Sequence, residues 1–133
     1  MKVADLMQKD LQVVSMDLSV TEAVVTFAES HIHGLPVVDR KDRMVGVLST
    51  SDVLQAAAEC ASAEERNALF ETTLVGEIMT SRPSTISPDA DVKDAAQQML
   101  ELDVHRLFVE QGGELVGVIA QSDIVRAVAT AKI

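Results

Sequence analysis

The chain contains two copies of one unit, and this duplication limits its possible folds more than any other feature of the sequence. With an offset of 72, residues 3–39 align with residues 75–111, and with an offset of 71, residues 44–54 align with residues 115–125. Fifteen of the 48 aligned positions are identical, and most other pairs keep their apolar or acidic character. The two copies are therefore expected to fold alike.

Each copy is predicted to form a strand, a helix, two strands and a second helix. Ser19 followed by Glu22 is a capping box at the start of a helix, and Asp91 takes the capping position in the second copy. Continuous apolar runs at residues 35–38 and 44–48 are typical of strands covered on both faces. Alternating strands and helices of this kind predict an α/β fold.

Turn residues and helix caps set the remaining boundaries. Hairpin loops are expected at residues 40–43 and 112–113, and the last helix of each copy is expected to begin near Ser49 and near Ala120. Residues 55–74 are rich in Ala, Glu, Gln and Leu and are predicted to be helical, with a further cap at Ser62. The first copy, the helical connection and the second copy are expected at residues 1–58, 59–74 and 75–133.

Composition excludes several classes of protein. Of the 133 residues, 47% are apolar and 24% are charged, which is typical of a globular chain with a sizeable core. The net charge of −10 works against binding to nucleic acid or to an anionic membrane. A single cysteine, Cys60, rules out an internal disulfide framework. Because there is neither a secretory segment nor an apolar run of about 18 residues, we expect a soluble cytoplasmic protein.

Four motifs lie between residues 33 and 89 of the duplicated chain: His33–Asp39, Gly46–Asp52, Glu77–Thr80 and Ile86–Asp89. Together they resemble the tandem cystathionine-β-synthase (CBS) domain pair. The resemblance implies an α/β (α+β) fold of two βαββα-type repeats packed about a pseudo-twofold axis. It also implies two clefts between the repeats that often hold AMP, ADP, ATP or S-adenosylmethionine as regulatory ligands, with no cofactor required. Such modules usually regulate another protein, here expected to be a separate effector chain.

Asp52 is the principal candidate for contact with a ligand. The residues alone explain it as the third helical position of a capping box that begins at Ser49. The same helix N-terminus offers free amides to a phosphate, and a carboxylate can accept both hydroxyls of a ribose. In the CBS family this Asp binds the ribose and the Ser contacts phosphate. The resemblance therefore implies a main cleft built from Ser49, Asp52, Thr85, His105 and Arg106.

The second cleft is expected to bind the ligand less tightly. The resemblance implies that it collects Val14, His33, Gly34, Ala120, Ser122 and Asp123. Ala120 has no hydroxyl, and Gly34 stands where the other copy has Arg106. An Arg at this strand end can bind a phosphate with a fork of donors, although a solvated or ion-paired strand end explains the same residue.

Metal binding and catalysis have less support in the sequence. On one strand, His31 and His33 would point the same way and share a metal ion, but the counterpart of His31 is Asp103 and no cysteine lies nearby. Histidines at a helix end are the favoured interpretation, so no metal site is predicted. Cys60 lies in an Ala-rich segment without a neighbouring His and is expected to be a packed thiol. The sequence contains neither a nucleophile–base pair nor a P-loop, and no enzyme is predicted.

Two functions remain in competition. The first is a regulatory module that senses an adenine nucleotide or an adenosyl compound and signals to a partner protein. The alternative is a structural module for dimerisation or docking, without a bound nucleotide. In either case a homodimer is expected, because the helices carry more apolar residues than one pair can cover. The broadest such stripe comprises Val53, Leu54, Ala57, Ala58 and Ala61.

Overall fold

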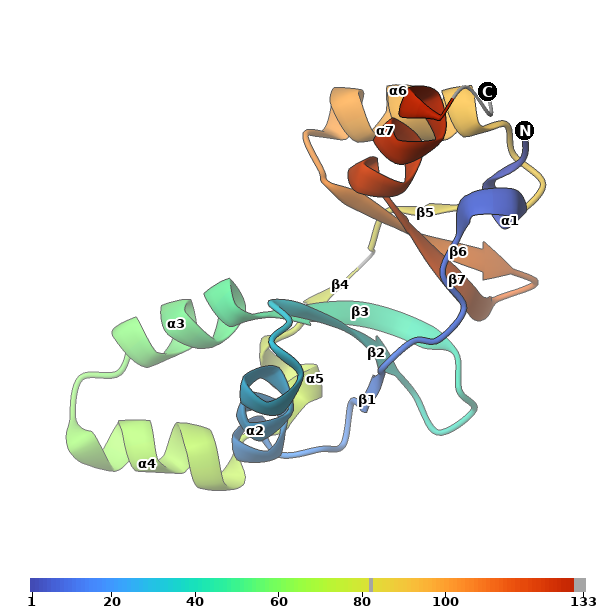
Figure 1. The fold of residues 1–133 in the computed structure, drawn as a ribbon. Helices are drawn as coiled ribbons and strands as arrows, with labels where there is room; N and C mark the ends of the chain where they lie inside the picture. Colours follow the sequence, from blue (N-terminus) through green and yellow to red (C-terminus); the bar gives the residue numbers. More distant parts are fainter. Residues whose placement is uncertain (82, 131–133) are drawn as a thin grey trace. The chain divides into compact units, whose positions relative to one another are not determined.

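The structure, a computed structural model, describes residues 1–81 and 83–130. It divides into two compact units, each described here by itself (Figure 1). The Asp52 unit consists of Gln12–Pro83, and the Asp123 unit consists of Met1–Leu11 together with Ser84–Ile133. The Asp52 unit thus includes residues 75–83 from the start of the second sequence copy, and the Asp123 unit includes residues 1–11 from the start of the first copy. In Figure 1 the N-terminal segment, in blue, accordingly lies with the helices in orange and red.

The Asp52 unit contains a sheet of four strands in the order β1-β2-β3-β4. Strands β1 and β2 are parallel, whereas β2–β3 and β3–β4 are antiparallel. Its elements are β1 (Val14–Ser15), α2 (Val20–Ser30), β2 (Gly34–Val38), β3 (Met44–Ser49), α3 (Thr50–Ala58), α4 (Ala63–Thr72), α5 (Val75–Ile78) and β4 (Thr80–Ser81).

The Asp123 unit repeats this topology with a sheet in the order β5-β6-β7. Its elements are α1 (Val3–Leu6), β5 (Thr85–Ile86), α6 (Val92–Leu102), β6 (Arg106–Gln111), β7 (Glu114–Ala120) and α7 (Gln121–Ala129). In place of a fourth strand, Gln8 forms a single bridge to Val118, with backbone hydrogen bonds of 2.8 and 3.0 Å. The predicted class, two mixed α/β repeats, is confirmed.

Each unit has its own apolar core between one face of the sheet and the helices. In the Asp52 unit, Leu35 and Leu48 are fully buried from adjacent strands, and Phe27 reaches them from α2. In the Asp123 unit, Leu107 and Ile119 occupy the matching positions, and Met99 lies where Phe27 does. Burial of a side chain of this size contributes about 1.5–3 kcal/mol, so these positions hold the sheets to the helices. The predicted core roles of Phe27 and Met99 are confirmed.

The helix starts lie at the predicted caps. Ser19 Oγ accepts a hydrogen bond of 3.3 Å from the Glu22 amide, and Asp91 Oδ1 accepts one of 2.8 Å from the Lys93 amide. The prediction of one helical connection over residues 55–74 was wrong in part, because α3 ends at Ala58 and α4 begins at Ala63. The physical reason is the cap at Ser62, whose hydroxyl accepts a hydrogen bond of 3.2 Å from an amide in the first turn of α4.

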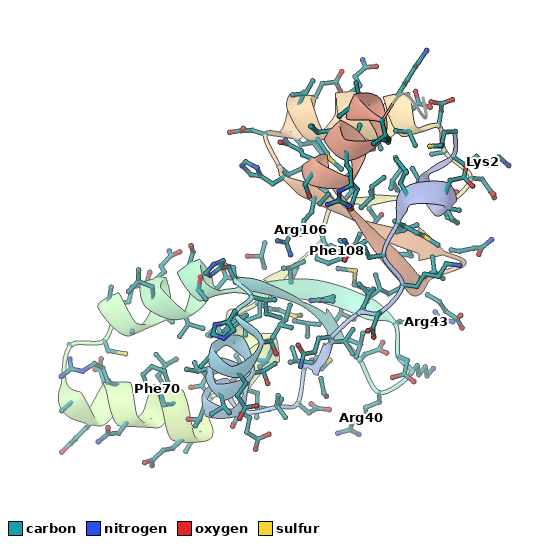
Figure 2. All side chains as sticks on the ribbon, viewed as in Figure 1. Lys2, Arg40, Arg43, Phe70, Arg106 and Phe108 are labelled. Atoms are coloured by element: carbon teal, nitrogen blue, oxygen red, sulfur yellow. The ribbon has the colours of Figure 1, made fainter. Side chains whose placement is uncertain are left out.

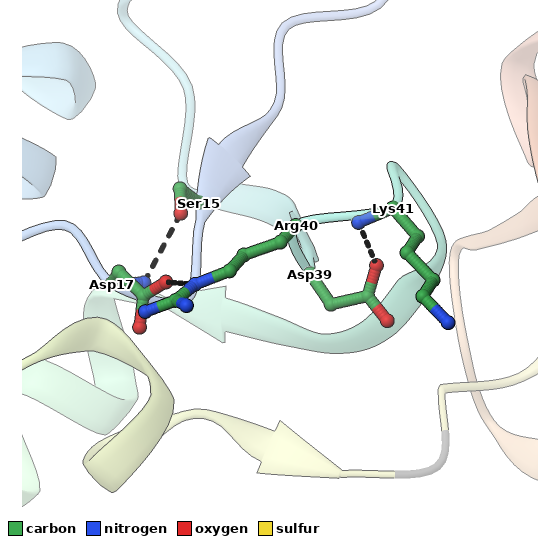
Figure 3. Close-up of polar contacts among 5 residues, drawn as sticks. All are labelled: Ser15, Asp17, Asp39, Arg40 and Lys41. Atoms are coloured by element: carbon green, nitrogen blue, oxygen red, sulfur yellow. Dashed lines mark hydrogen bonds and ion pairs between the residues drawn. The ribbon is translucent and has the colours of Figure 1, made fainter.

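The hairpin between β2 and β3 turns on Asp39, which is shown with its neighbours in Figure 3. Its carboxylate accepts hydrogen bonds from the Lys41 amide at 2.8 Å and from the Arg43 amide at 3.0 Å. These backbone donors, that of Arg43 first, lower the pKa of Asp39 below its ordinary value of 3.8. Asp42 adopts a φ of 61° to complete the turn.

The matching hairpin of the Asp123 unit uses glycine. Gly112 and Gly113 have φ values of 61° and 87°, which glycine adopts without steric cost. The two hairpins therefore differ: the longer loop at residues 39–43 is held by side-chain hydrogen bonds, and the shorter loop at residues 112–113 uses the conformational freedom of glycine.

Candidate functional site

The helix α3 begins directly where β3 ends, and this junction fixes Asp52. Ser49 is the N-cap of α3, with φ −111° and ψ 161°. Its hydroxyl oxygen accepts a hydrogen bond of 3.1 Å from the Asp52 amide, and Asp52 Oδ2 accepts one of 2.8 Å from the Ser49 amide. This reciprocal pair is the predicted capping box, which is confirmed. The Ser49 hydroxyl accepts in this pair, and among the described residues it donates to no partner.

The second oxygen of the same carboxylate has a partner that the sequence did not reveal. Thr80 Oγ1 donates a hydrogen bond of 3.0 Å to Asp52 Oδ1. Thr80 lies in β4, beside Val47 of β3. Strand β4 approaches this closely because Gly46 has no side chain: a Cβ there would lie 2.7 Å from the Thr80 carbonyl oxygen.

Asp123 occupies the equivalent place at the start of α7, with different neighbours. Its Oδ2 accepts a hydrogen bond of 2.9 Å from the Ala120 amide, but Ala120 has no hydroxyl oxygen to accept one from the Asp123 amide. Gln8 Nε2 donates to Asp123 Oδ1 at 3.3 Å, and Arg126 Nη1 lies 3.8 Å from the same oxygen. Asp123 is only 6% exposed, whereas Asp52 is half-buried.

The predicted ligand residues divide between the two units. Residues Ser49, Asp52, Val14, His33 and Gly34 belong to the Asp52 unit, and Thr85, His105, Arg106, Ala120, Ser122 and Asp123 belong to the Asp123 unit. Each expected cleft draws on both units, so its assembly stays a prediction. Val14 is buried against its sheet, and only its backbone can face a ligand.

Within each unit, the strand register brings two candidate positions together. Gly34 pairs with Ser49, and Arg106 pairs with Ala120. The Arg106 side chain is exposed and is labelled in Figure 2 at the start of β6. His105 precedes it, and the His105 carbonyl oxygen accepts a hydrogen bond of 2.9 Å from the Gln121 amide at the start of α7. The candidate polar groups of a unit therefore gather at one end of its sheet.

The positions of His31 and His33 do not match the premise that the two side chains point the same way from one strand and share a metal ion. His31 is the C-cap of α2 in the left-handed conformation, with φ 54°, and β2 begins only at Gly34. His31 and His33 are thus not alternate residues of one strand. Over residues 1–81 and 83–130, no group of three His, Cys, Asp or Glu side chains is arranged to hold a metal ion. Cys60 Sγ donates a hydrogen bond of 3.3 Å to the Ala56 carbonyl.

The helical side of the Asp52 unit carries an apolar groove of about 530 Å³. It is formed by α2, α3 and α4, and by the segment before β2. Helix α4 is joined to α2 by a hydrogen bond from the Thr21 hydroxyl to the Phe70 carbonyl, and Phe70 is labelled in Figure 2. The groove is lined by Val24, Phe27, Ala28, His31, Ile32, His33, Thr50, Val53, Leu54, Ala57 and Phe70.

Comparison with known proteins agrees with the repeated architecture. The family model described as "CBS domain" matches this chain twice, over residues 3–59 and 75–130. The chain belongs to the CBS domain family. This confirms the resemblance to a tandem CBS pair that the sequence motifs indicated.

Individual CBS-pair proteins match over nearly the whole chain. A crystal structure of CBSX2 in complex with AMP, from Arabidopsis thaliana, is 31% identical, with a TM-score of 0.81 and coverage of 99% of this chain and 98% of that one. The protein AcuB from Vibrio cholerae is 26% identical, with a TM-score of 0.82 and coverage of 99% of this chain and 93% of that one.

Among curated relatives, the chloroplastic CBS domain-containing protein CBSX1 of Arabidopsis thaliana is 31% identical over 90% of this chain. This chain spans 60% of the length of CBSX1 and 59% of that of CBSX2. As for membranes, none of the helices in the described part of this CBS pair has the length and apolar character of a membrane span.

Proposed function

We propose that this CBS pair is a regulatory module that binds an adenine nucleotide or an adenosyl compound and signals to a separate partner protein. The observation that carries the proposal is the AMP complex of CBSX2, a protein 31% identical to this chain over 99% of its length. The second support is Asp52, a half-buried carboxylate held at a helix N-terminus by its own capping box. The proposed role is regulation without catalysis.

The proposed chemistry of binding follows from the groups at the start of α3. The carboxylate of Asp52 accepts the two ribose hydroxyls. The hydroxyl proton of Ser49 and the Ser51 amide donate to phosphate, since the Thr50 and Asp52 amides already donate to the His33 carbonyl and the Ser49 hydroxyl. The helix dipole favours the negative charge there. Arg106 and His105 supply cationic or donor groups from the other unit, with Thr85 beside them. A protein with a net charge of −10 needs such local donors to hold an anion.

The second proposed cleft centres on Asp123, with Ser122 and Ala120 beside it and Val14, His33 and Gly34 from the other unit. It lacks the cap hydroxyl and the guanidinium of the first cleft, so we propose that it binds phosphate-bearing ligands more weakly. A cytoplasmic location is part of the same proposal, although the relative CBSX1 is chloroplastic.

Ultraviolet absorbance and calorimetry test the proposed function. Because the chain contains neither Trp nor Tyr, a band at about 260 nm in the purified protein would report a bound nucleotide. Protein stripped of any such ligand is titrated with AMP, ADP, ATP and S-adenosylmethionine. Saturable binding of at least one of them is expected. If all four titrations were flat, the alternative function, a structural docking module with empty clefts, would replace the proposal.

We also propose that the protein forms a homodimer through its helices. The supporting observation is exposure of large apolar side chains on both helix pairs: Leu54 on α3 is 72% exposed, Leu100 on α6 is 76% exposed and Val125 on α7 is 64% exposed. Exposed apolar side chains of this kind indicate an association surface, and Leu54 also lines the groove of the Asp52 unit. Light scattering is expected to give twice 14.3 kDa.

Matched variants make the test of dimerisation specific. Leu54→Lys is expected to shift the protein toward the monomer, because the charge would be buried at the interface. Val13→Lys is the control, since Val13 is also exposed but lies outside the helices. A wild-type mass of 14.3 kDa at micromolar concentration would contradict the homodimer.

A further inference from the structure

The two units carry apolar hollows of different size at equivalent places on their helices. The groove of the Asp52 unit has a volume of about 530 Å³, whereas the hollow between α6 and α7 of the Asp123 unit has a volume of about 200 Å³. The residues that line the smaller hollow all have counterparts in the groove at offsets of 72 or 71; they are Ala96, Met99, Leu100, Gln121, Ile124 and Val125. Duplication has therefore left one surface deeply hollowed and its copy nearly filled.

One pair of counterparts shows the complementarity of the two surfaces most clearly. Ala28 lines the groove, and a short side chain at this place on α2 leaves room beside it. Its counterpart Leu100 is 76% exposed on α6, and Val125 on α7 is 64% exposed. We call the surface around these two side chains the Leu100–Val125 face. It projects apolar groups of the size that the groove lacks.

Pairing each surface with its own copy would waste this complementarity. A groove that faced a second groove would leave its lining atoms without packing partners. A Leu100–Val125 face against a second one would bring two projecting leucines together, while the groove stayed uncovered. Placing the Leu100–Val125 face of one copy in the groove of another covers both apolar surfaces at once.

The distribution of charge favours the same crossed pairing. The helices around the groove, α2, α3 and α4, carry six carboxylates and one arginine, a net charge of −5. Helices α6 and α7 carry three carboxylates, one lysine and one arginine, a net charge of −1. Coulomb repulsion grows with the product of the two charges, so a contact between two grooves is the most unfavourable of the possible pairings.

We propose that the occupant of the groove is the Leu100–Val125 face of a second copy of this chain, and that the homodimer is therefore antiparallel. Helices α2, α3 and α4 of one protomer contact α6 and α7 of its partner, and twofold symmetry repeats the contact. The inference rests on the proposed homodimer and specifies which surfaces meet. Ala28 of one protomer then lies beside the partner's Leu100.

Cysteine crosslinking tests this neighbourhood. Ala28→Cys and Leu100→Cys are made in separate chains, both with Cys60→Ser, and one chain carries a tag that separates the products by mass. The chains are unfolded and refolded together and then treated with a short bismaleimide. The antiparallel homodimer is expected to give crosslinks between the two different chains and few in either protein alone. A parallel homodimer would give crosslinks within each single-cysteine protein.

A charge exchange tests the same contact without a crosslinker. Ala28→Glu and Leu100→Lys are each expected to weaken dimerisation about tenfold or more, because each places an unpaired charge in an apolar contact. The double variant pairs the new carboxylate with the partner's new ammonium group and is expected to recover most of the lost affinity. In a parallel homodimer the double variant would be weaker than either single one. Sedimentation over a range of concentrations gives the dissociation constants.

Leu102→Lys is the matched control, because Leu102 is 50% exposed on α6 but lies outside the lining of both hollows. It is expected to leave dimerisation unchanged. If the wild-type protein is a dimer but crosslinks only within the single-cysteine proteins, or if Ala28→Glu leaves its affinity unchanged, the inference is overturned and the homodimer stands. A wild-type mass of 14.3 kDa would overturn the homodimer together with the inference.

Discussion

The N-termini of α3 and α7 descend from one duplicated segment, yet they present their carboxylates differently. Both close a strand-to-helix junction, and both aspartates accept a hydrogen bond from the amide three residues earlier, at 2.8 Å and 2.9 Å. Only α3 has a cap hydroxyl, and only Asp123 has a guanidinium beside it. The comparison shows that duplication preserved the backbone geometry, whereas the neighbouring side chains decide what each carboxylate can still bind.

The largest expected effect separates the two aspartates in ligand binding. Asp52→Ala is expected to weaken the tighter AMP event by a hundredfold or more, because two charge-assisted hydrogen bonds of about 1.5–3 kcal/mol each are lost. Asp123→Ala is expected to have a much smaller effect on that event. Calorimetric titration of both variants provides the measurement. Loss of the tight site in Asp123→Ala alone would reverse the assignment.

The next largest effect concerns Gly46 and Gly117, which lie against the segments that each unit takes from the other sequence copy. A Cβ on Gly46 would lie 2.7 Å from a backbone oxygen, that of Thr80, whereas a Cβ on Gly117 would lie 3.0 Å from the Gln8 oxygen and 2.7 Å from the flexible Met7 side chain. Gly46→Ala is therefore expected to destabilise its unit by about 2–3 kcal/mol, and Gly117→Ala by about 1 kcal/mol. Urea unfolding measures both, and equal losses would argue against the difference in strand approach.

The helix caps allow the two units to be made more alike. Ser49→Ala is expected to cost about 1 kcal/mol, because the Asp52 amide loses its partner at 3.1 Å. Ala120→Ser is expected to stabilise α7 by up to a similar amount, since it supplies the missing cap hydroxyl. Amide hydrogen exchange in α3 and α7 reports each helix separately. Faster exchange in α7 after Ala120→Ser would be inconsistent with the capping account.

The smallest effect distinguishes the two hairpins by their dependence on pH. The folded-state pKa of Asp39 is lowered by the Arg43 and Lys41 amides, so its contribution to stability is present above the unfolded value and is lost as the pH falls through the folded value. Asp39→Asn is expected to lower stability slightly near neutral pH and to have less effect in acid. The Gly112–Gly113 hairpin has no such carboxylate. A difference between wild type and variant that grew in acid would contradict this assignment.

The sequence was sufficient to predict the repeats, because 48 positions align between the two copies at offsets of 72 and 71. Local signals were sufficient to predict the caps at Ser19 and Ser49 and the glycine hairpin, because these features depend on residues within four positions of one another. The contact between Thr80 and Asp52 could not be predicted, because it joins segments from different sequence copies through a close strand approach. The left-handed conformation of His31, the C-cap of α2, was also missed. The cap at Ser62 was predicted, but the end of α3 at Ala58 before it was not.

A crystal structure of the protein grown with AMP is the most direct test of the central claim that the two carboxylates are not equivalent. The account predicts AMP with both ribose hydroxyls within hydrogen-bond distance of Asp52, Oδ1 and Oδ2 each accepting one, and with its phosphate at the Ser49 hydroxyl. At Asp123 it predicts lower occupancy. AMP bound through its diol at Asp123, with Asp52 unoccupied, would contradict the account.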